Sequence, residues 1–259
     1  MELIERSFFV QITRDEFGEI RDGRMHDLVH DLAQSVASVG CSILETGNSQ
    51  VVSKELRHSS LVGKSKTSTV LESLNEATNL RTLLLLSCKL DSNPQLLQNL
   101  VCLRVLDLSE SGIRKLSKAI GNLKHLRYLN LSHTNIKTLP ESISNLRNLQ
   151  TLELVECYDF QELPRAICEL TNLRNLDFQS CPLLIHIPRG IGKLEFLQRL
   201  PVFLVNNMDG SAGLCELRSL ELRERLEIKN LKFVKCAEDA SEAKLHEKAG
   251  IISLALSWG

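Results

Sequence analysis

Four consecutive segments decide the fold of this chain: CLRVLDLSESGIRKLSKAIGNL (102–123), HLRYLNLSHTNIKTLPESISNL (125–146), NLQTLELVECYDFQELPRAICEL (148–170) and NLRNLDFQSCPLLIHIPRGIGKL (172–194). They align with one another, and their leading leucines recur every 23 or 24 residues: Leu103, Leu126, Leu149 and Leu173. Two further apolar columns recur at the same intervals. Self-similarity at a fixed period is the signature of a repeat protein, in which like units stack on one another.

The apolar spacing within one segment predicts a strand followed by a return. Leu106 and Leu108 alternate with polar neighbours, which places one face of a short strand inward. Ile120 and Leu123 face inward again at helical spacing. In three segments a proline stops the intervening chain from joining a ladder: Pro140, Pro164 and Pro188. Each segment therefore predicts one coil of an α/β solenoid, with parallel strands on the concave face and short helices or irregular returns on the convex face.

The coils resemble the leucine-rich repeat, whose pattern is L-x-x-L-x-L-x-x-N/C-x-L. The N/C position holds Ser111, Thr134, Cys157 and Cys181, so two coils carry a hydroxyl residue in place of the usual Asn or Cys. The resemblance implies that this side chain satisfies backbone groups at the turn after the strand. We expect Ser and Thr to do so less completely.

The repeat continues on both sides of these segments with less regularity. NLRTLLLLSCKL (79–90) forms an earlier coil, and FLQRLPVFLV (196–205) begins one that a proline interrupts. We therefore expect regular leucine-rich repeats over 80–205 and irregular, truncated ones over 206–259. No polar capping coil follows the last apolar strand, so the chain looks cut short or part of something larger.

The N-terminal residues follow a different pattern. Two apolar runs flank the turn-rich TRDEFG (13–18), which predicts a β-hairpin. MHDLVHDLAQSVA (25–37) then places its leucines, valines and alanines on one face of a helix, with Asp27 in the first turn. We expect residues 1–39 to form one segment and residues 40–79 to form a linker and the N-terminal cap of the solenoid.

This N-terminal pattern resembles plant intracellular disease-resistance proteins of the nucleotide-binding, leucine-rich-repeat type, and more narrowly their coiled-coil class. The residues that carry the resemblance are RSFF (6–9), the hairpin, MHDLVHDLA (25–33), and LEIKNLKFVKCAEDASEAKLHEKAGIISLALSW (226–258), which is similar to the irregular mid-repeat segment of the family. The resemblance implies that residues 1–39 are the C-terminal part of a winged-helix segment that ends in the family's MHD motif.

In that family Met25, His26 and Asp27 would be the MHD motif. The resemblance implies that His26 approaches the β-phosphate of bound ADP and holds the off state, with Asp27 beside it. The coiled coil, the phosphate-binding loop and the metal-binding aspartate motif would lie before residue 1 and are absent from this chain. ADP or ATP is therefore implied for a full-length parent, and no cofactor is expected for the chain alone.

Two other motifs resemble a phosphate-binding loop and a metal-binding site, but only in part. GKSKTS (63–68) has the end of a phosphate-binding loop, but His58 stands where the first glycine is needed, so we interpret it as a solvated linker. His26 and His30 lie four residues apart with Asp27 and Asp31 beside them, a spacing that could hold a metal in an HD-type phosphohydrolase. An amphipathic helix with a polar face is the favoured interpretation, so we expect no metal site and no enzyme.

Composition narrows the function classes. The 259 residues carry 31 Lys and Arg against 32 Asp and Glu, a net charge of -1, and only 4% are aromatic, which disfavours a nucleic-acid partner. No apolar stretch is long enough to span a membrane, and the N-terminus has no secretory signal. The eight cysteines form no CxxC pair, which fits reduced thiols in the cytoplasm.

Function should lie on the concave face, where stacking brings equal positions of successive coils into columns. A mostly basic column would run beside a mostly acidic one, and Tyr128 would be the best single anchor. These charges either pair with one another and keep the face soluble, or dock a protein partner. The residues expected to bind a partner are Arg104, Asp107, Arg127, Tyr128, Asn130, Gln150, Glu153, Arg174 and Asp177.

The favoured function is a non-catalytic protein-interaction module of a plant immune receptor. By the family resemblance it would sense a pathogen effector or a modified host protein and restrain the nucleotide-binding module of the parent receptor. The alternatives are a stand-alone leucine-rich-repeat adaptor without an immune role, in which residues 1–39 serve only as a cap, and the metal-dependent phosphohydrolase.

Overall fold

The computed structural model describes residues 9–14, 20–37, 40–45, 53–62, 74–86, 88–90 and 98–259. The chain divides into two compact units, Met1–Ser42 and Ile43–Gly259. This division falls three residues after the predicted boundary between 39 and 40. The GKSKTS segment (63–68) lies outside the described residues.

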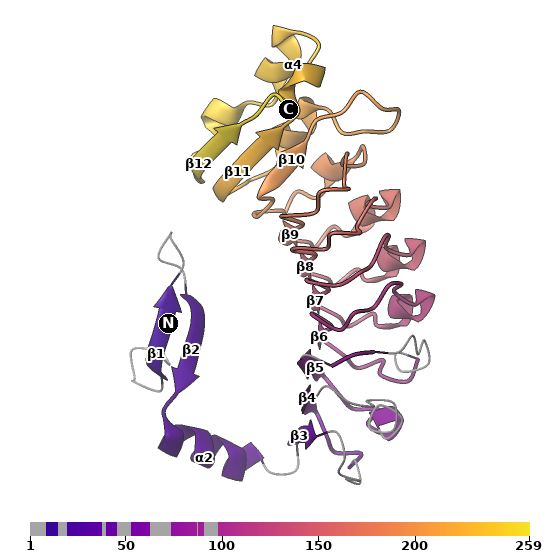
Figure 1. Ribbon diagram of the computed structural model, residues 1–259, viewed down its shortest axis with the longest axis vertical. Helices are drawn as coiled ribbons and strands as arrows, with labels where there is room; N and C mark the ends of the chain where they lie inside the picture. The colour runs from indigo at the N-terminus through magenta and orange to yellow at the C-terminus, as the bar shows by residue number, and fades with distance from the viewer. Residues whose placement is uncertain are drawn as a thin grey trace. The chain divides into compact units, whose positions relative to one another are not determined.

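The first unit contains a hairpin and a helix. Strands β1 (Phe9–Arg14) and β2 (Ile20–Met25) pair in antiparallel fashion, and α2 (Asp27–Ala37) follows at once (Figure 1). The predicted hairpin and helix are confirmed. Three large apolar residues of α2 are strongly exposed: Leu28 at 74%, Leu32 at 62% and Val36 at 79%.

The second unit is built on a seven-stranded sheet whose strands follow one another in chain order (Figure 1). Strands β4 to β9 pair in parallel, with equal positions of successive coils opposite one another. The sheet begins within the segment 40–79, expected to be a linker and cap. Its strands are β3 (Cys41–Glu45), β4 (His58–Val62), β5 (Thr82–Leu86), β6 (Val105–Asp107), β7 (Tyr128–Asn130), β8 (Thr151–Glu153) and β9 (Asn175–Asp177).

Short 3-10 helices form the returns, and Figure 1 shows them on the side of the coils away from the strands. In the regular coils they are η2 (Lys118–Asn122), η3 (Glu141–Asn145), η4 (Arg165–Glu169) and η5 (Ile191–Lys193), and η1 (Leu74–Glu76) precedes them. The repeated leucines of strand and return lie between the two layers and are almost wholly buried, as Leu106, Leu129, Leu152 and Leu176 illustrate at 0% exposure. This continuous apolar core is what holds one coil on the next.

A second sheet follows a break at Pro201. Strands β10 (Val202–Leu204), β11 (Glu224–Lys229) and β12 (Ile251–Leu256) pair in parallel, but β10 is not part of the seven-stranded sheet. Pro201 has no amide hydrogen to donate to a neighbouring strand, which accounts for the interruption. The connecting helices are η6 (Leu214–Ser219), η7 (Leu231–Phe233), α4 (Ala237–Glu242) and η8 (Leu245–Glu247).

The turn after each strand shows what the N/C position does. The thiol of Cys157 bonds the carbonyl oxygen of Leu131 in the preceding coil at 3.1 Å, and that of Cys181 bonds the Leu154 oxygen at 3.1 Å. Thr134 instead donates to Leu131 of its own coil at 2.6 Å. A hydroxyl at this position therefore caps its own turn, whereas a thiol also links two coils.

Candidate protein-interaction surface

The outward-pointing residues of the strands and of the positions just before them form one surface, which we call the strand face. In each coil, the backbone amide of the residue after the leading leucine donates to the carbonyl oxygen of the equivalent residue in the previous coil, at 2.7 to 2.8 Å. These bonds align an arginine column, defined as Arg57, Arg81, Arg104, Arg127 and Arg174, with Gln150 between the last two. Adjacent strands lie about 4.8 Å apart, so successive side chains of the column extend from backbone positions at about that spacing.

None of these five arginines makes an ion pair within the described parts of the chain. Four of them are exposed, and Arg81 is half-buried. By contrast, Arg147 elsewhere in the solenoid forms an ion pair with Glu169 of the next coil at 2.8 Å. The arginine column is therefore a stripe of uncompensated positive charge, which favours an acidic partner.

The acidic column lies three residues further along the chain, and its side chains bond backbone amides and neighbouring side chains. Asp107 accepts a hydrogen bond from the side chain of Asn130 at 3.2 Å and another from the amide of Ser109 at 2.8 Å. Asn130 caps the amide of Ser132 in the same way at 2.9 Å. Among the described residues, no ion pair of 4.0 Å or less joins the arginine column to Asp107, Glu153 or Asp177.

Tyr128 and Glu153 face each other across strands β7 and β8. The Tyr128 hydroxyl donates to the Glu153 carboxylate at 2.8 Å, and both side chains are half-buried. Burial raises the pKa of Glu153, and burial together with the nearby Glu153 charge raises the pKa of Tyr128. The predicted anchor therefore has its hydroxyl engaged, and its ring is what remains for a partner.

Asp177 corrects the expectation that the whole acidic column is exposed. Its residue exposure is only 6%, and its carboxylate lies 3.5 Å from the Arg199 guanidinium. Arg199 also approaches Glu224 at 3.9 Å. Because Arg199 follows in the irregular coil after β9, it covers Asp177 and removes it from the accessible part of the strand face.

Sequence reasoning missed the first two members of the arginine column. Leu56-Arg57 and Leu80-Arg81 repeat the Leu-Arg pair found at Arg104, and this pair was the available signal. The near-neutral total charge also hid an uneven distribution. Residues 53–150 carry 14 Lys and Arg against 7 Asp and Glu, whereas residues 151–259 carry 13 against 16.

The MHD residues lie where β2 meets α2. His26 and Asp27 are exposed, and the His26 Nδ1 accepts a hydrogen bond from the Leu28 amide at 3.2 Å. His30 lies 3.6 Å from Asp31. Within the described ranges, no group of three or more His, Cys, Asp and Glu residues is arranged to hold a metal ion. No helix in those ranges is long and apolar enough to cross a membrane.

Parallel strands stacked at 23- to 24-residue intervals, with 3-10 returns, define a leucine-rich-repeat solenoid of the α/β class. Residues 79–255 match the family model for a leucine-rich repeat region. This match covers more than half of the chain, and the chain belongs to that family.

A curated relative gives a narrower similarity. The disease resistance protein RGA4 of Solanum bulbocastanum is 41% identical over 262 residues, which cover 99% of this chain and 23% of the relative. The chain thus spans about a quarter of the length of that protein.

Solved structures support the fold alone. The leucine-rich repeat domain of the type III effector XopL has a TM-score of 0.54 at 18% identity, over 88% of this chain and 81% of that one. The ectodomain of the Arabidopsis thaliana receptor kinase GASSHO1/SCHENGEN3 gives 0.52 at 18% identity, over 79% and 28%. A leucine-rich-repeat protein of Leptospira interrogans gives 0.50 at 24% identity, over 79% and 55%.

Proposed function

We propose that this chain is a non-catalytic protein-recognition part of a plant disease-resistance receptor that works in the cytoplasm. The arginine column carries the proposal, because it is a periodic, exposed and uncompensated charge pattern on the strand face. Leucine-rich-repeat surfaces of this kind bind macromolecules through their shape and columns of repeated side chains. The 41% identity to a disease resistance protein supports the receptor context.

The proposed partners are proteins of two kinds. One is a pathogen effector or a host protein that an effector has modified. The other is the nucleotide-binding module of the parent receptor, which the strand face would restrain in its off state. Both would present acidic surface to the arginine column, since opposite charges speed association and reject unsuitable partners.

The N-terminal unit fits a contribution to nucleotide binding in an intact module. It would be the end of a winged-helix segment of a receptor of the coiled-coil class. The His26 Nδ1 accepts the Leu28 amide hydrogen, so the neutral ring carries its proton on the exposed Nε2. That N–H is suited to donate to a phosphate oxygen of ADP, with Asp27 beside it at the start of α2. The chain alone is proposed to take no nucleotide.

Charge reversal tests the strand face. The triple variant R104E/R127E/R174E should abolish the capture of a co-expressed nucleotide-binding module in a pull-down. Each substitution removes a cation and adds an anion where an acidic partner is proposed to dock. The readout is the amount of module retained on the immobilised chain at physiological salt.

A matched triple variant controls for the altered net charge. R114E/K115E/K118E makes the same change in charge at three exposed residues outside the strands. This control should retain the module. Equal retention by both triple variants and by the unaltered chain would refute a docking role for the arginine column.

A further inference from the structure

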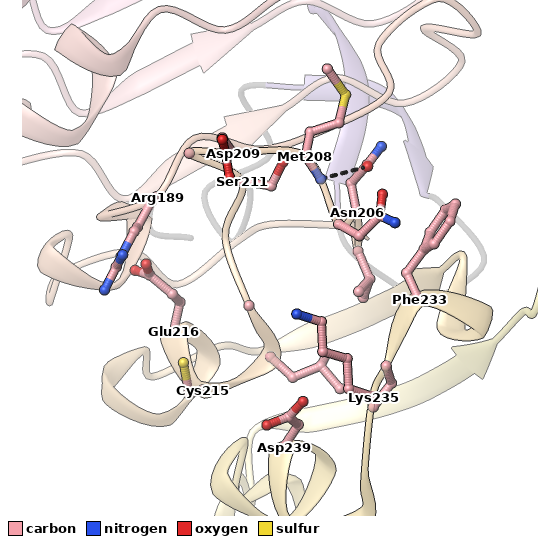
Figure 2. Close-up of a pocket in the computed structure, with 16 residues that line it drawn as sticks. Arg189, Asn206, Met208, Asp209, Ser211, Cys215, Glu216, Phe233, Lys235 and Asp239 are labelled. Carbon is pink, nitrogen blue, oxygen red and sulfur yellow. Dashed lines mark hydrogen bonds between the residues drawn. The ribbon is translucent and has the colours of Figure 1, made fainter.

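A second cluster of cations lies away from the strand face, around η4, η5 and η6. An open cavity of about 670 Å³ is lined there by Arg165, Arg189 and Lys193 together with Glu216. Figure 2 shows the neighbouring pocket, with Arg189 and Glu216 at the same end of it. The cavity volume falls within the range of sites that take small molecules.

The one carboxylate in this cavity is already engaged. The Oε1 of Glu216 accepts a hydrogen bond from the Gly190 amide at 2.8 Å, and its Oε2 accepts one from the Gly192 amide at 2.8 Å. Glu216 therefore holds the first turn of η5 against the next coil. It offsets one positive charge of the three, and the cavity keeps a net excess of two.

The three cations have no ion-pair partner within 4.0 Å among the described residues. Each of the two columns that supply these cations also holds one acid in an earlier coil. Lys193 stands one 24-residue repeat after Glu169, which pairs with Arg147 at 2.8 Å. Arg165 stands one repeat after Glu141, and Lys118 precedes Glu141 in the same column. The charge in these columns therefore varies from coil to coil, and both columns hold cations where the cavity lies.

We propose that this cavity binds a small anion with two or more linked phosphate groups, through Arg165, Arg189 and Lys193. Guanidinium groups match phosphate oxygens with paired N–H donors, and the lysine adds a mobile point charge. Two linked phosphate groups present more acceptor oxygens than one sulfate or one carboxylate, so a single anion of this kind can accept hydrogen bonds from all three side chains. The site is separate from the arginine column and does not depend on the proposed function.

Isothermal titration of the full chain with pyrophosphate tests this site. Saturable binding of one pyrophosphate per chain is expected, with weaker binding of inorganic phosphate and of sulfate. The variant R189A/K193A should weaken binding at least about tenfold, since it removes two of the three cations that would donate charge-assisted hydrogen bonds to the anion. R165A, tested separately, should weaken it in the same direction.

The matched control is K118A, which removes an exposed cation from the column of Arg165 in an earlier coil. It should bind pyrophosphate as the unaltered chain does. Circular dichroism melting checks that every variant is folded. Absence of saturable binding, equal affinity in R189A/K193A, an equal loss in K118A, or sulfate binding as tightly as pyrophosphate would each overturn the proposal.

Discussion

Ser59 occupies a position that leucine fills in the other coils. It lies opposite Leu83 in the ladder between β4 and β5, and the next residue in that column is Leu106. Ser59 is 3% exposed, and its hydroxyl has no hydrogen-bond partner. A buried hydroxyl without a partner costs about 1–3 kcal/mol. This position therefore weakens the first coils of the solenoid.

Replacing Ser59 by alanine should stabilise the protein. The substitution Ser59→Ala removes the unsatisfied hydroxyl and is expected to raise the free energy of unfolding by about 1 kcal/mol. Ser111→Ala is the matched control, because Ser111 is also buried but donates to the carbonyl of Leu108. It should lower the free energy of unfolding by about 1 kcal/mol. Urea denaturation measures both, and a loss of stability in both variants would contradict this account of Ser59.

The same residue explains why β4 was not predicted as a strand of the repeat. The segment HSSLV (58–62) has only one leucine in the alternating pattern, so the sequence signal is weak although the backbone pairs normally with β5. By contrast, the strands at 105–107, 128–130, 151–153 and 175–177 were predictable, because leucine fills their inward position at a constant interval.

The returns depend on a close approach that only small residues permit. A Cβ on Gly121 would lie 2.8 Å from the carbonyl oxygen of Ser142 in η3. A Cβ on Gly192 would lie 2.7 Å from the carbonyl oxygen of Glu216 in η6. Both contacts are with backbone of the next coil, which cannot rotate away. Glycine at these two positions therefore sets the spacing between neighbouring 3-10 helices.

Alanine at Gly121 should force η2 and η3 apart. The expected loss is about 1–3 kcal/mol in the free energy of unfolding, the usual effect of overpacking. Gly213→Ala is the control, because its Cβ would meet nothing closer than 3.5 Å and its φ of -87° suits any residue. Chemical denaturation compares the two variants. A Gly121→Ala protein as stable as Gly213→Ala would show that the coils can separate at no cost.

The columns of the strand face were predictable for the same reason as the strands, since a constant repeat length determines which residues of successive coils are neighbours. The burial of individual column residues by side chains from other coils was not predictable. Asp177 is covered by Arg199, which belongs to the coil where Pro201 breaks the ladder. The repeat pattern gives no information on a side chain that reaches back from an irregular coil, so the burial of Asp177 required the structure.

At the scale of the whole molecule, the apolar core belongs to the second unit. The cluster of buried hydrophobic residues runs from Leu44 to Ala243, all within that unit. In a solenoid, stability is close to a sum of coil and interface contributions, so a segment outside the core adds little to the cooperative unit. Removing residues 1–39 tests whether they serve as a cap, as the adaptor alternative requires.

Deleting residues 1–39, which leaves β3 whole, should therefore leave a folded solenoid. The protein 40–259 is expected to remain in solution and to unfold at a midpoint within about 3 °C of the full chain, because a change below about 0.5 kcal/mol shifts the midpoint of a domain this size by only a few degrees. Thermal unfolding followed by circular dichroism, with size-exclusion chromatography, measures both properties. Aggregation of 40–259, or a drop of more than about 10 °C, would favour the capping role and with it the adaptor. Retention of the fold would leave residues 1–39 available for a different task, as the proposed nucleotide-sensing unit of a larger receptor requires.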